Sequence, residues 1–108
     1  MRALSRAVRL LHRGYTCVAC DRDRVLTSQK PGVAPLLEWL DSDESLRGCT
    51  VADRTVGREA AMLLLRSGVS TVYADVMSAP ARSLLREAGV ETEFAALVRE
   101  LSETAMPQ

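Results

Sequence analysis

The chain has 108 residues, which is enough for one domain with one core and too few for two. Hydrophobic residues make up 47% of the chain and charged residues 26%, as in ordinary globular proteins, and the formal net charge is zero. With no net positive charge and only one Trp, two Tyr and one Phe, the composition argues against nucleic-acid binding.

The N-terminal segment, residues 1–14, contains arginines and no acidic residue. Transit peptides and membrane-surface helices have a similar composition. However, Leu4, Val8 and Leu11 recur at the spacing of one helix face, so we predict a helix that packs on the core. No apolar run approaches the roughly 20 residues that span a bilayer. We therefore expect a cytoplasmic protein with no membrane partner.

Two short β-prone runs follow, residues 15–20 and 25–28, and the polar turn between them predicts an antiparallel hairpin. The cysteines are Cys17, Cys20 and Cys49. Their odd number, without a secretory signal, favours reduced thiols over disulfides. Positions 17 and 20 of one strand point to opposite faces, so buried core residues are favoured over a redox pair or a zinc site with His12.

The middle of the chain predicts two helices around a strand. Lys30-Pro31-Gly32 opens the second helix of the chain, on which apolar residues at helical spacing predict one buried face. These residues are Val33, Leu36, Leu37 and Leu40. Residues 49–52 predict the third strand and residues 58–66 the third helix. That helix is apolar nearly all the way round, so we expect neighbours to shield it.

The last part of the chain predicts a strand at residues 69–77, after Ser67-Gly68 closes the third helix. Ser78 is a predicted helix N-cap, with Pro80 in the first turn. Residues 90–95 predict a fifth strand and residues 96–103 a final helix. Parallel strands joined by right-handed helical crossovers, together with the hairpin, give a mixed five-stranded sheet. We therefore predict an α/β fold, a three-layer α/β/α sandwich, formed by residues 1–108 as a single domain.

Three stretches carry a family resemblance that runs over about residues 4–98. They are Gly-Val-Ala-Pro-Leu-Leu at 32–37, Val-Ala-Asp-Arg-Thr-Val-Gly-Arg-Glu-Ala-Ala at 51–61, and Val-Tyr-Ala-Asp-Val-Met-Ser at 72–78. In these the chain resembles a family of uncharacterised bacterial proteins, the domain-of-unknown-function family DUF1893. The resemblance implies a cytidine deaminase-like fold. Many family members end in a tail with a Cys-Pro pair; residues 105–108 contain no cysteine, so no role is carried over to this tail.

The deaminase resemblance also shows what this chain lacks. Zinc deaminases hold their metal with His or Cys at the start of the second helix and two Cys at the start of the third, and a Glu moves protons. Here neither residues 32–34 nor residues 53–57 contain His or Cys. We therefore expect no zinc and no zinc-dependent deamination.

The fold that the resemblance implies points the N-termini of the second and third helices toward one end of the sheet, where their free N–H groups favour an anion. The predicted ligand-binding residues there are Gly32, Asp53, Arg54, Gly57, Arg58 and Ser78. A carboxylate at Asp53 could accept ribose hydroxyls or act as a nucleophile. In the alternative interpretation Asp53 and Ser78 are helix N-caps, and Arg54 and Arg58 are solvated surface charges.

Three classes of function remain open from the sequence. The chain could bind a nucleotide or an ADP-ribose-like ligand without metal, transfer a group through Asp53, or serve only in protein–protein association. We expect a homodimer by analogy with other deaminase-fold proteins. The residues leave open whether the chain is an enzyme, and they specify no cofactor.

Overall fold

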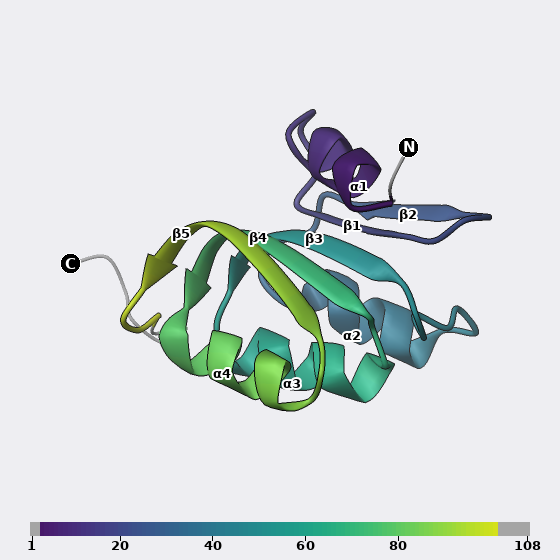
Figure 1. Cartoon of the computed structure of the whole chain (residues 1–108). Helices are drawn as coiled ribbons and strands as arrows, with labels where there is room; N and C mark the ends of the chain where they lie inside the picture. Colours follow the sequence, from purple (N-terminus) through teal and green to yellow (C-terminus); the bar gives the residue numbers. More distant parts are fainter. Residues whose placement is uncertain (1–2, 102–108) are drawn as a thin grey trace.

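Four helices and five strands form the part of the chain that the computed structural model describes, residues 3–101 (Figure 1). The helices are α1 (Ala3–Leu11), α2 (Ala34–Asp41), α3 (Arg58–Ser67) and α4 (Ala79–Glu87). The strands are β1 (Cys17–Cys20), β2 (Val25–Ser28), β3 (Thr50–Val56), β4 (Thr71–Ser78) and β5 (Glu91–Val98).

The sheet has the strand order β2-β1-β3-β4-β5. Strand β1 runs antiparallel to both of its neighbours, whereas β3, β4 and β5 run parallel to one another. Because β2 and β3 both run opposite to β1, they also point in the same direction. The antiparallel hairpin and the mixed five-stranded sheet predicted from the sequence are confirmed.

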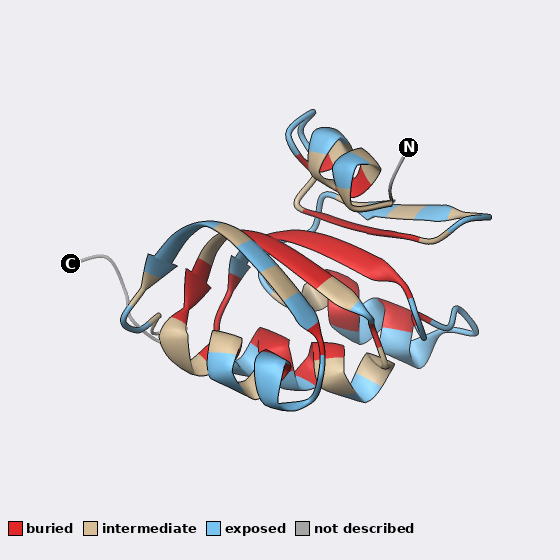
Figure 2. Cartoon of the chain, in the orientation of Figure 1, coloured by how far each residue is buried: buried red, intermediate tan, exposed pale blue. Residues whose placement is uncertain are grey.

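Helices cover both faces of the sheet, which gives three layers (Figure 1). Helix α1 lies alone on one face, over a small core that includes Leu11, Val18 and Tyr73. Helices α2, α3 and α4 lie on the other face, over a larger core that includes Leu36 and Leu64. Figure 2 shows the central strands buried between these layers, and the outer sides of the helices exposed. The predicted three-layer α/β/α sandwich is therefore confirmed.

Helix α1 packs on the sheet as its apolar spacing predicts. Leu11 is fully buried, and Leu4 and Val8 pack against the same core cluster. No helix within residues 3–101 is long and apolar enough to cross a membrane.

The ends of α3 and α4 also follow their sequence signals. Gly68 closes α3 in the left-handed conformation, with φ of +75°, which glycine adopts without steric cost. The Ser78 hydroxyl oxygen accepts a 3.1 Å hydrogen bond from the Ala81 backbone N–H, so Ser78 is the predicted N-cap of α4. Pro80 lies in the first turn of this helix, where its missing N–H costs nothing.

Two strands are longer than predicted, and one predicted helix is wrong. Strand β3 extends to Val56 because it pairs with β4 along its whole length, so residues 53–56 do not form a loop before α3. At the end of the chain, Ala96, Leu97 and Val98 pair with β4 and extend β5. The predicted helix 96–103 is wrong over its described part, because sheet pairing outweighs the helix propensity of these residues. Residues 102 and 103, like the tail 105–108, lie outside the described residues.

The buried faces of two helices also differ from the prediction. On α2 the buried residues are Pro35, Leu36 and Trp39, whereas Leu37 and Leu40 are exposed. Helix α3 buries Ala60, Ala61, Leu63 and Leu64, but Met62 is exposed, so neighbours do not shield this helix on every side. An apolar pattern that continues round a helix leaves open which side meets the sheet.

Candidate functional site

Asp53 lies in the middle of β3 and on the face of the sheet that α2, α3 and α4 cover. Val51 belongs to the core beneath these helices and Ala52 to the core beneath α1, so alternation returns Asp53 to the side of the three helices. Asp53 is in register with Cys17 on β1 and with Ala74 on β4, both of which belong to the same larger core. The predicted strand, residues 49–52, would place Asp53 at its C-terminal end, and this position is wrong because β3 continues to Val56.

The Asp53 carboxyl is buried with little hydrogen bonding. Only 5% of the residue is exposed, and its one described hydrogen bond is 2.8 Å long, from the Arg54 backbone N–H to Oδ1. Burial raises the pKa of Asp53 to about 7, against the opposing effect of that hydrogen bond, and the charge of Asp75 adds to the rise. Near neutral pH this carboxyl can therefore hold or release a proton.

The Cys17 thiol of β1 lies directly across from Asp53 in the sheet and is a second group that could release a proton. Burial raises the pKa of Cys17 well above its usual value, and the Asp53 carboxylate raises it further. The thiol therefore stays protonated near neutral pH, and Asp53 is the stronger acid of the two. Ser28 of β2 is in register with Cys17 on the other side of β1. Its hydroxyl oxygen accepts a 3.1 Å hydrogen bond from the Lys30 backbone N–H.

Helices α2 and α3 both begin at the end of the sheet where strands β2 and β3 finish, because each helix follows its strand along the chain. Their N-cap residues are Val33 and Gly57, and neither makes a side-chain capping bond. In contrast, the Ser78 side chain caps α4 at the same end of the sheet. Gly57 is the N-cap of α3, so Asp53 does not cap it, and that alternative for Asp53 is wrong. The start of α3, which has no side-chain cap, thus lies about 10 Å along the sheet from Asp53, since three residues of β3 separate Asp53 from the strand end. Strand β2, which precedes α2, ends at Ser28, in register with Cys17 and so level with Asp53.

The other predicted site residues lie apart from Asp53. Arg54 points to the opposite face, where its Nε donates to the Tyr15 carbonyl (3.1 Å) and its Nη2 to the Leu11 carbonyl (3.2 Å). Arg58 is exposed in a hollow on the outer side of α3, together with Met62. The structure therefore brings neither guanidinium together with the buried carboxyl.

Gly32 and Ser78 complete the predicted set. Gly32 is exposed in the loop before α2, with φ of +60°, a conformation that favours glycine. Ser78 is buried, and its hydroxyl is used by the cap of α4. From the predicted set, Asp53 and Gly57 remain as the core of the candidate site, with Gly32 at the entry to α2.

The residues at the helix starts do not fit the zinc of a deaminase. Val33 and Gly57 offer no ligand side chain there, and Cys17 is the single thiol on that face of β1. Cys20 faces α1, and His12 bonds to a carboxylate on the α1 side. Among residues 3–101, no three His, Cys, Asp or Glu side chains gather into a group that could hold a metal ion.

A polar cluster on the α1 side of the sheet was not predicted from the sequence. Asp75 Oδ1 lies 2.8 Å from His12 Nε2 and accepts a 2.8 Å hydrogen bond from the Tyr73 hydroxyl. Burial alone would raise the pKa of Asp75, but the hydrogen bonds from His12 and Tyr73 outweigh it and hold the pKa below its usual range. Alternation along β4 could have placed Tyr73 and Asp75 on one face, but His12 comes from 63 positions away in the sequence.

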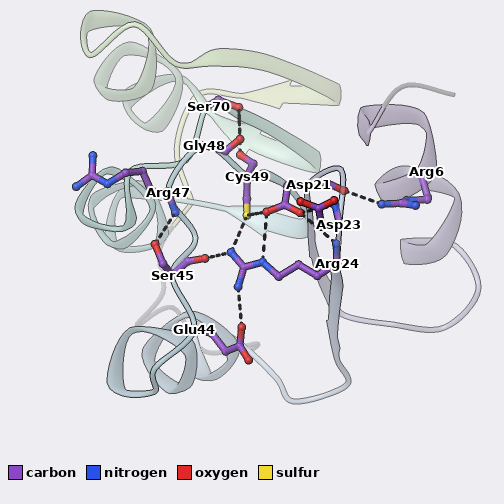
Figure 3. A network of polar contacts seen from close by, with 10 residues as sticks. All are labelled: Arg6, Asp21, Asp23, Arg24, Glu44, Ser45, Arg47, Gly48, Cys49 and Ser70. Atoms are coloured by element: carbon purple, nitrogen blue, oxygen red, sulfur yellow. Dashed lines mark hydrogen bonds and ion pairs between the residues drawn. The ribbon is translucent and has the colours of Figure 1, made fainter.

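A second polar cluster lies around Arg24 (Figure 3), at the end of the sheet opposite to the starts of the helices. Its guanidinium bonds to Asp21 (3.3 Å), Glu44 (2.6 Å) and the Ser45 carbonyl, and so joins the β1–β2 turn to the loop after α2. The Asp21 carboxylate also accepts hydrogen bonds from the backbone N–H groups of residues 23 and 24, which is an Asx-turn. The Arg24 guanidinium is engaged within the protein, so it holds two loops together.

Comparisons with known proteins agree with this fold. A family model described as "TM1506: Domain of unknown function (DUF1893)" matches residues 6–100. The crystal structure of the DUF1893 family protein TM1506 from Thermotoga maritima is 25% identical, with a TM-score of 0.82 over 96% of this chain and 72% of that one. No curated protein sequence matches the chain.

Two deaminases share the fold at lower identity. The apo dCMP deaminase of cyanophage S-TIM5 is 15% identical, with a TM-score of 0.57 over 85% of this chain and 93% of that chain. The diaminohydroxyphosphoribosylaminopyrimidine deaminase/5-amino-6-(5-phosphoribosylamino)uracil reductase of Thermotoga maritima is 17% identical, with a TM-score of 0.56. That match covers 83% of this chain and 34% of the other. The likeness at these identities shows a cytidine deaminase-like fold.

Proposed function

The chain belongs to the DUF1893 family and has a deaminase-like fold whose helix starts, at Val33 and Gly57, offer no metal-ligating side chain. Because it also buries a carboxyl in the sheet, we propose that it binds a nucleotide or an ADP-ribose-like ligand at Asp53. The observation that carries this proposal is the state of the Asp53 carboxyl. It is 5% exposed, with a pKa of about 7 and one described hydrogen bond. Burying such a group costs free energy unless further donors satisfy it.

A sugar hydroxyl is the donor that suits this carboxyl. Ionised Asp53 is an acceptor only, and a ribose diol can donate two hydrogen bonds to it. The phosphate of the same ligand would reach the uncapped start of α3, about 10 Å away, where N–H groups and the helix dipole favour an anion. The two deaminases of similar fold are named for substrates that carry a phosphorylated pentose, which supports this ligand class.

The same carboxyl could also form a covalent bond. A carboxylate oxygen of Asp53 would attack the anomeric carbon of the ribose, and the group bonded there would leave with the bonding electron pair. The product is an ester of Asp53. With a pKa of about 7, a substantial fraction of the carboxyl is ionised and nucleophilic at neutral pH.

Calorimetric titration with AMP, ADP and ADP-ribose tests the binding. We expect the wild type to bind at least one of them, and Asp53→Asn to weaken that binding at least tenfold, because a hydrogen bond to a charged group contributes about 1.5–3 kcal/mol. Asp75→Asn is the matched control, since Asp75 lies on the α1 side, and its affinity should stay within about twofold of the wild type. Equal affinity of the wild type and Asp53→Asn, or no binding by the wild type, would contradict the proposal.

The second candidate is protein–protein association. The observation that favours it is separate from Asp53: large apolar side chains are exposed on the outer sides of α2 and α3. The two functions use different surfaces, so one molecule could have both.

A further inference from the structure

A polar hollow of about 220 Å³ lies where the C-terminal ends of α2 and α3 meet the loop of residues 42–49. It is smaller than the roughly 300–1,000 Å³ of most ligand pockets, so it suits a small ligand. The side chains used below are those of Trp39 on α2, Glu44, Ser45 and Arg47 on the loop, and Arg66 on α3. Because these helices start near the other end of the sheet, the hollow lies apart from their N-termini.

Two exposed arginines give the hollow a surplus of positive charge. Within residues 3–101, the guanidinium groups of Arg47 and Arg66 have no ion-pair or hydrogen-bond partner. Glu44 is the one acidic residue of the described lining. Its carboxylate already bonds to Arg24 at 2.6 Å, so the charge of Glu44 is balanced outside the hollow. An anion is therefore the ligand that the charges favour.

The loop that carries Arg47 is fixed against the end of α3. The Gly48 backbone N–H donates a 2.8 Å hydrogen bond to the Gly68 carbonyl. The stem of Arg47 lies beside Gly68, where an added methyl carbon would be 3.6 Å from Arg47 Cγ. Figure 3 shows the Arg47 side chain pointing away from the contacts around Arg24. Arg47 and Arg66 thus lie at the same end of α3.

The indole N–H of Trp39 is an unused donor at this hollow. Trp39 is 7% exposed, and within residues 3–101 its N–H has no hydrogen-bond partner. The N–H is not sealed in the interior, since the sealed unpartnered nitrogens of that part are Nε of Arg6 and of Arg82. It therefore meets solvent where Trp39 lines the hollow. The Ser45 hydroxyl accepts a 3.2 Å hydrogen bond from the Arg47 backbone N–H and keeps its own proton to donate.

Helix ends alone do not account for this arrangement. Arg66 suits the last turn of α3, where a cation complements the helix dipole. However, the Leu63 carbonyl in this turn already accepts a 2.8 Å hydrogen bond from the Ser67 hydroxyl. Arg47 belongs to a loop and Trp39 is neutral, so the dipole of α3 explains neither of them.

We propose that this hollow binds a phosphate group, either free or carried by a small molecule. A guanidinium can donate two parallel hydrogen bonds to phosphate, so Arg47 and Arg66 can hold the anion from two sides. Trp39 and Ser45 each donate one further hydrogen bond. A carboxylate would offer only two oxygens to these four side chains. The proposal does not depend on Asp53, which lies in the middle of β3.

Trp39 makes the site directly observable, because it is the only tryptophan of the chain and gives one indole N–H resonance in an NMR spectrum. Titration of the full chain with inorganic phosphate, at constant ionic strength, should shift this resonance until it saturates. We expect a dissociation constant in the millimolar range, because both arginines are exposed to water and salt. Chloride at the same ionic strength should leave the resonance in place.

Arg47→Gln and Arg66→Gln should each weaken phosphate binding at least tenfold, because each removes charged donors. Arg86→Gln is the matched control, since Arg86 is also an exposed arginine in the last turn of a helix, α4, and it should leave the constant unchanged. Asp53→Asn should leave it unchanged too, which separates this site from the ligand proposed for Asp53.

Three results would overturn the phosphate site. They are a Trp39 resonance that stays in place at tens of millimolar phosphate, a shift that chloride reproduces, and a constant that Arg47→Gln and Arg66→Gln leave unchanged. An equal loss in Arg86→Gln would reduce the effect to overall charge and would also contradict the proposal. Glycerol 3-phosphate distinguishes the two sources of the group. Tighter binding than inorganic phosphate supports a phosphorylated small molecule, and weaker binding supports the free anion.

Discussion

Asp53 combines burial, a nearly neutral pKa and sparse hydrogen bonding, and these properties have one cause. The side chain faces a core of aliphatic residues, with Cys17 and Ala74 beside it in the sheet. Water stabilises an ionised carboxylate far better than this surrounding does, so the folded protein keeps the proton to a higher pH. A residue that costs stability in this way is a candidate for binding, since selection for stability alone would favour a neutral side chain.

Stability should therefore fall as pH rises from about 4 to 7. Across this range folded Asp53 keeps a proton that the unfolded chain, with an ordinary pKa near 3.8, has released. Raising the pH then lowers the free energy of unfolding, by an amount on the order of 4 kcal/mol once the pH exceeds 7. We expect Asp53→Asn to remove this slope and to be more stable than the wild type at pH 8. Urea unfolding at pH 5 and pH 8 measures both effects.

Asp75→Asn supplies a control of opposite sign. The pKa of Asp75 is held below its usual range, so its charge stabilises the folded state above that range and this contribution is lost as the pH falls. Replacing it should destabilise the protein at pH 8, where replacing Asp53 stabilises it. If both variants lose stability equally at pH 8, the account of Asp53 is wrong.

For single residues, the sequence predicted the sheet face of a side chain correctly where strand alternation alone determines it. Cys17 and Cys20 lie on opposite faces as predicted, in different core clusters. Asp53 was predicted at a strand end, because Asp and Arg have low strand propensity and the predicted strand stopped before them. The pairing of β3 with β4, which carries the strand through Asp53 and Arg54, depends on residues about twenty positions away.

At the scale of the elements, Arg54 joins α1 to the sheet. Its guanidinium bonds to the carbonyls of Leu11 and Tyr15, at the C-terminal end of α1, where a cation also suits the helix dipole. On the other side of α1, Arg6 Nη2 donates to the Asp21 carbonyl (2.8 Å) and the Cys20 thiol donates to the Ala3 carbonyl (3.3 Å). Helix α1 is thus held at both ends by polar contacts and in the middle by its apolar face.

Removing one of these contacts should loosen α1 selectively. Arg54→Ala should cost about 1 kcal/mol, discounted for the exposure of the side chain, and so speed hydrogen exchange of the α1 amides about fivefold. Exchange in α3 and α4 should not change. Arg58→Ala, which removes an exposed arginine without a described partner, is the control. Unchanged exchange in α1 after Arg54→Ala would show that the apolar face alone holds this helix.

The start of α4 gives a matched pair of serines. Ser78 caps the helix from a buried position, whereas Ser83 is exposed in the middle of the same helix. Ser78→Ala should destabilise the protein by about 1 kcal/mol, because the Ala81 N–H loses its partner. Ser83→Ala should be neutral or slightly stabilising, because alanine has the higher helix propensity. Thermal unfolding of the two variants checks this, and equal effects would contradict the role of the cap.

Helix ends were predictable because Gly68, Ser78 and Pro80 carry local signals. The buried side of α2 was not, since Leu36, Leu37, Trp39 and Leu40 allow two apolar faces, and contact with the sheet and α3 selects one. The segment from Ala96 to Val98 was predicted as helix from its own composition, but β4 offers it an open edge. Tertiary pairing, and not local propensity, thus determines the buried side of α2 and the conformation of residues 96–98.

For the whole molecule, the alternation of strands and helices was sufficient to predict the layers and the mixed sheet. Motifs at residues 32–37, 51–61 and 72–78 led to the family, which the match over residues 6–100 confirms. The order of the strands required the structure, because the sequence does not show that β1 lies between β2 and β3. The fold is therefore well determined by its sequence, whereas the proposal of a ligand depends on the burial of Asp53, which only the pairing of β3 with β4 reveals.

The most direct test of the central claim, that Asp53 binds a nucleotide-like ligand, is the intact mass of the purified protein with ADP-ribose, native and then denatured. We expect a native mass heavier by one ligand, which Asp53→Asn lacks and Asp75→Asn keeps. If an added mass equal to the ligand less the water lost from its anomeric carbon persists after denaturation, Asp53 holds the ligand as an ester, and if all the added mass is lost, the binding is reversible. A native mass equal to that of the bare chain, or an added mass that Asp53→Asn retains in full, would contradict the claim.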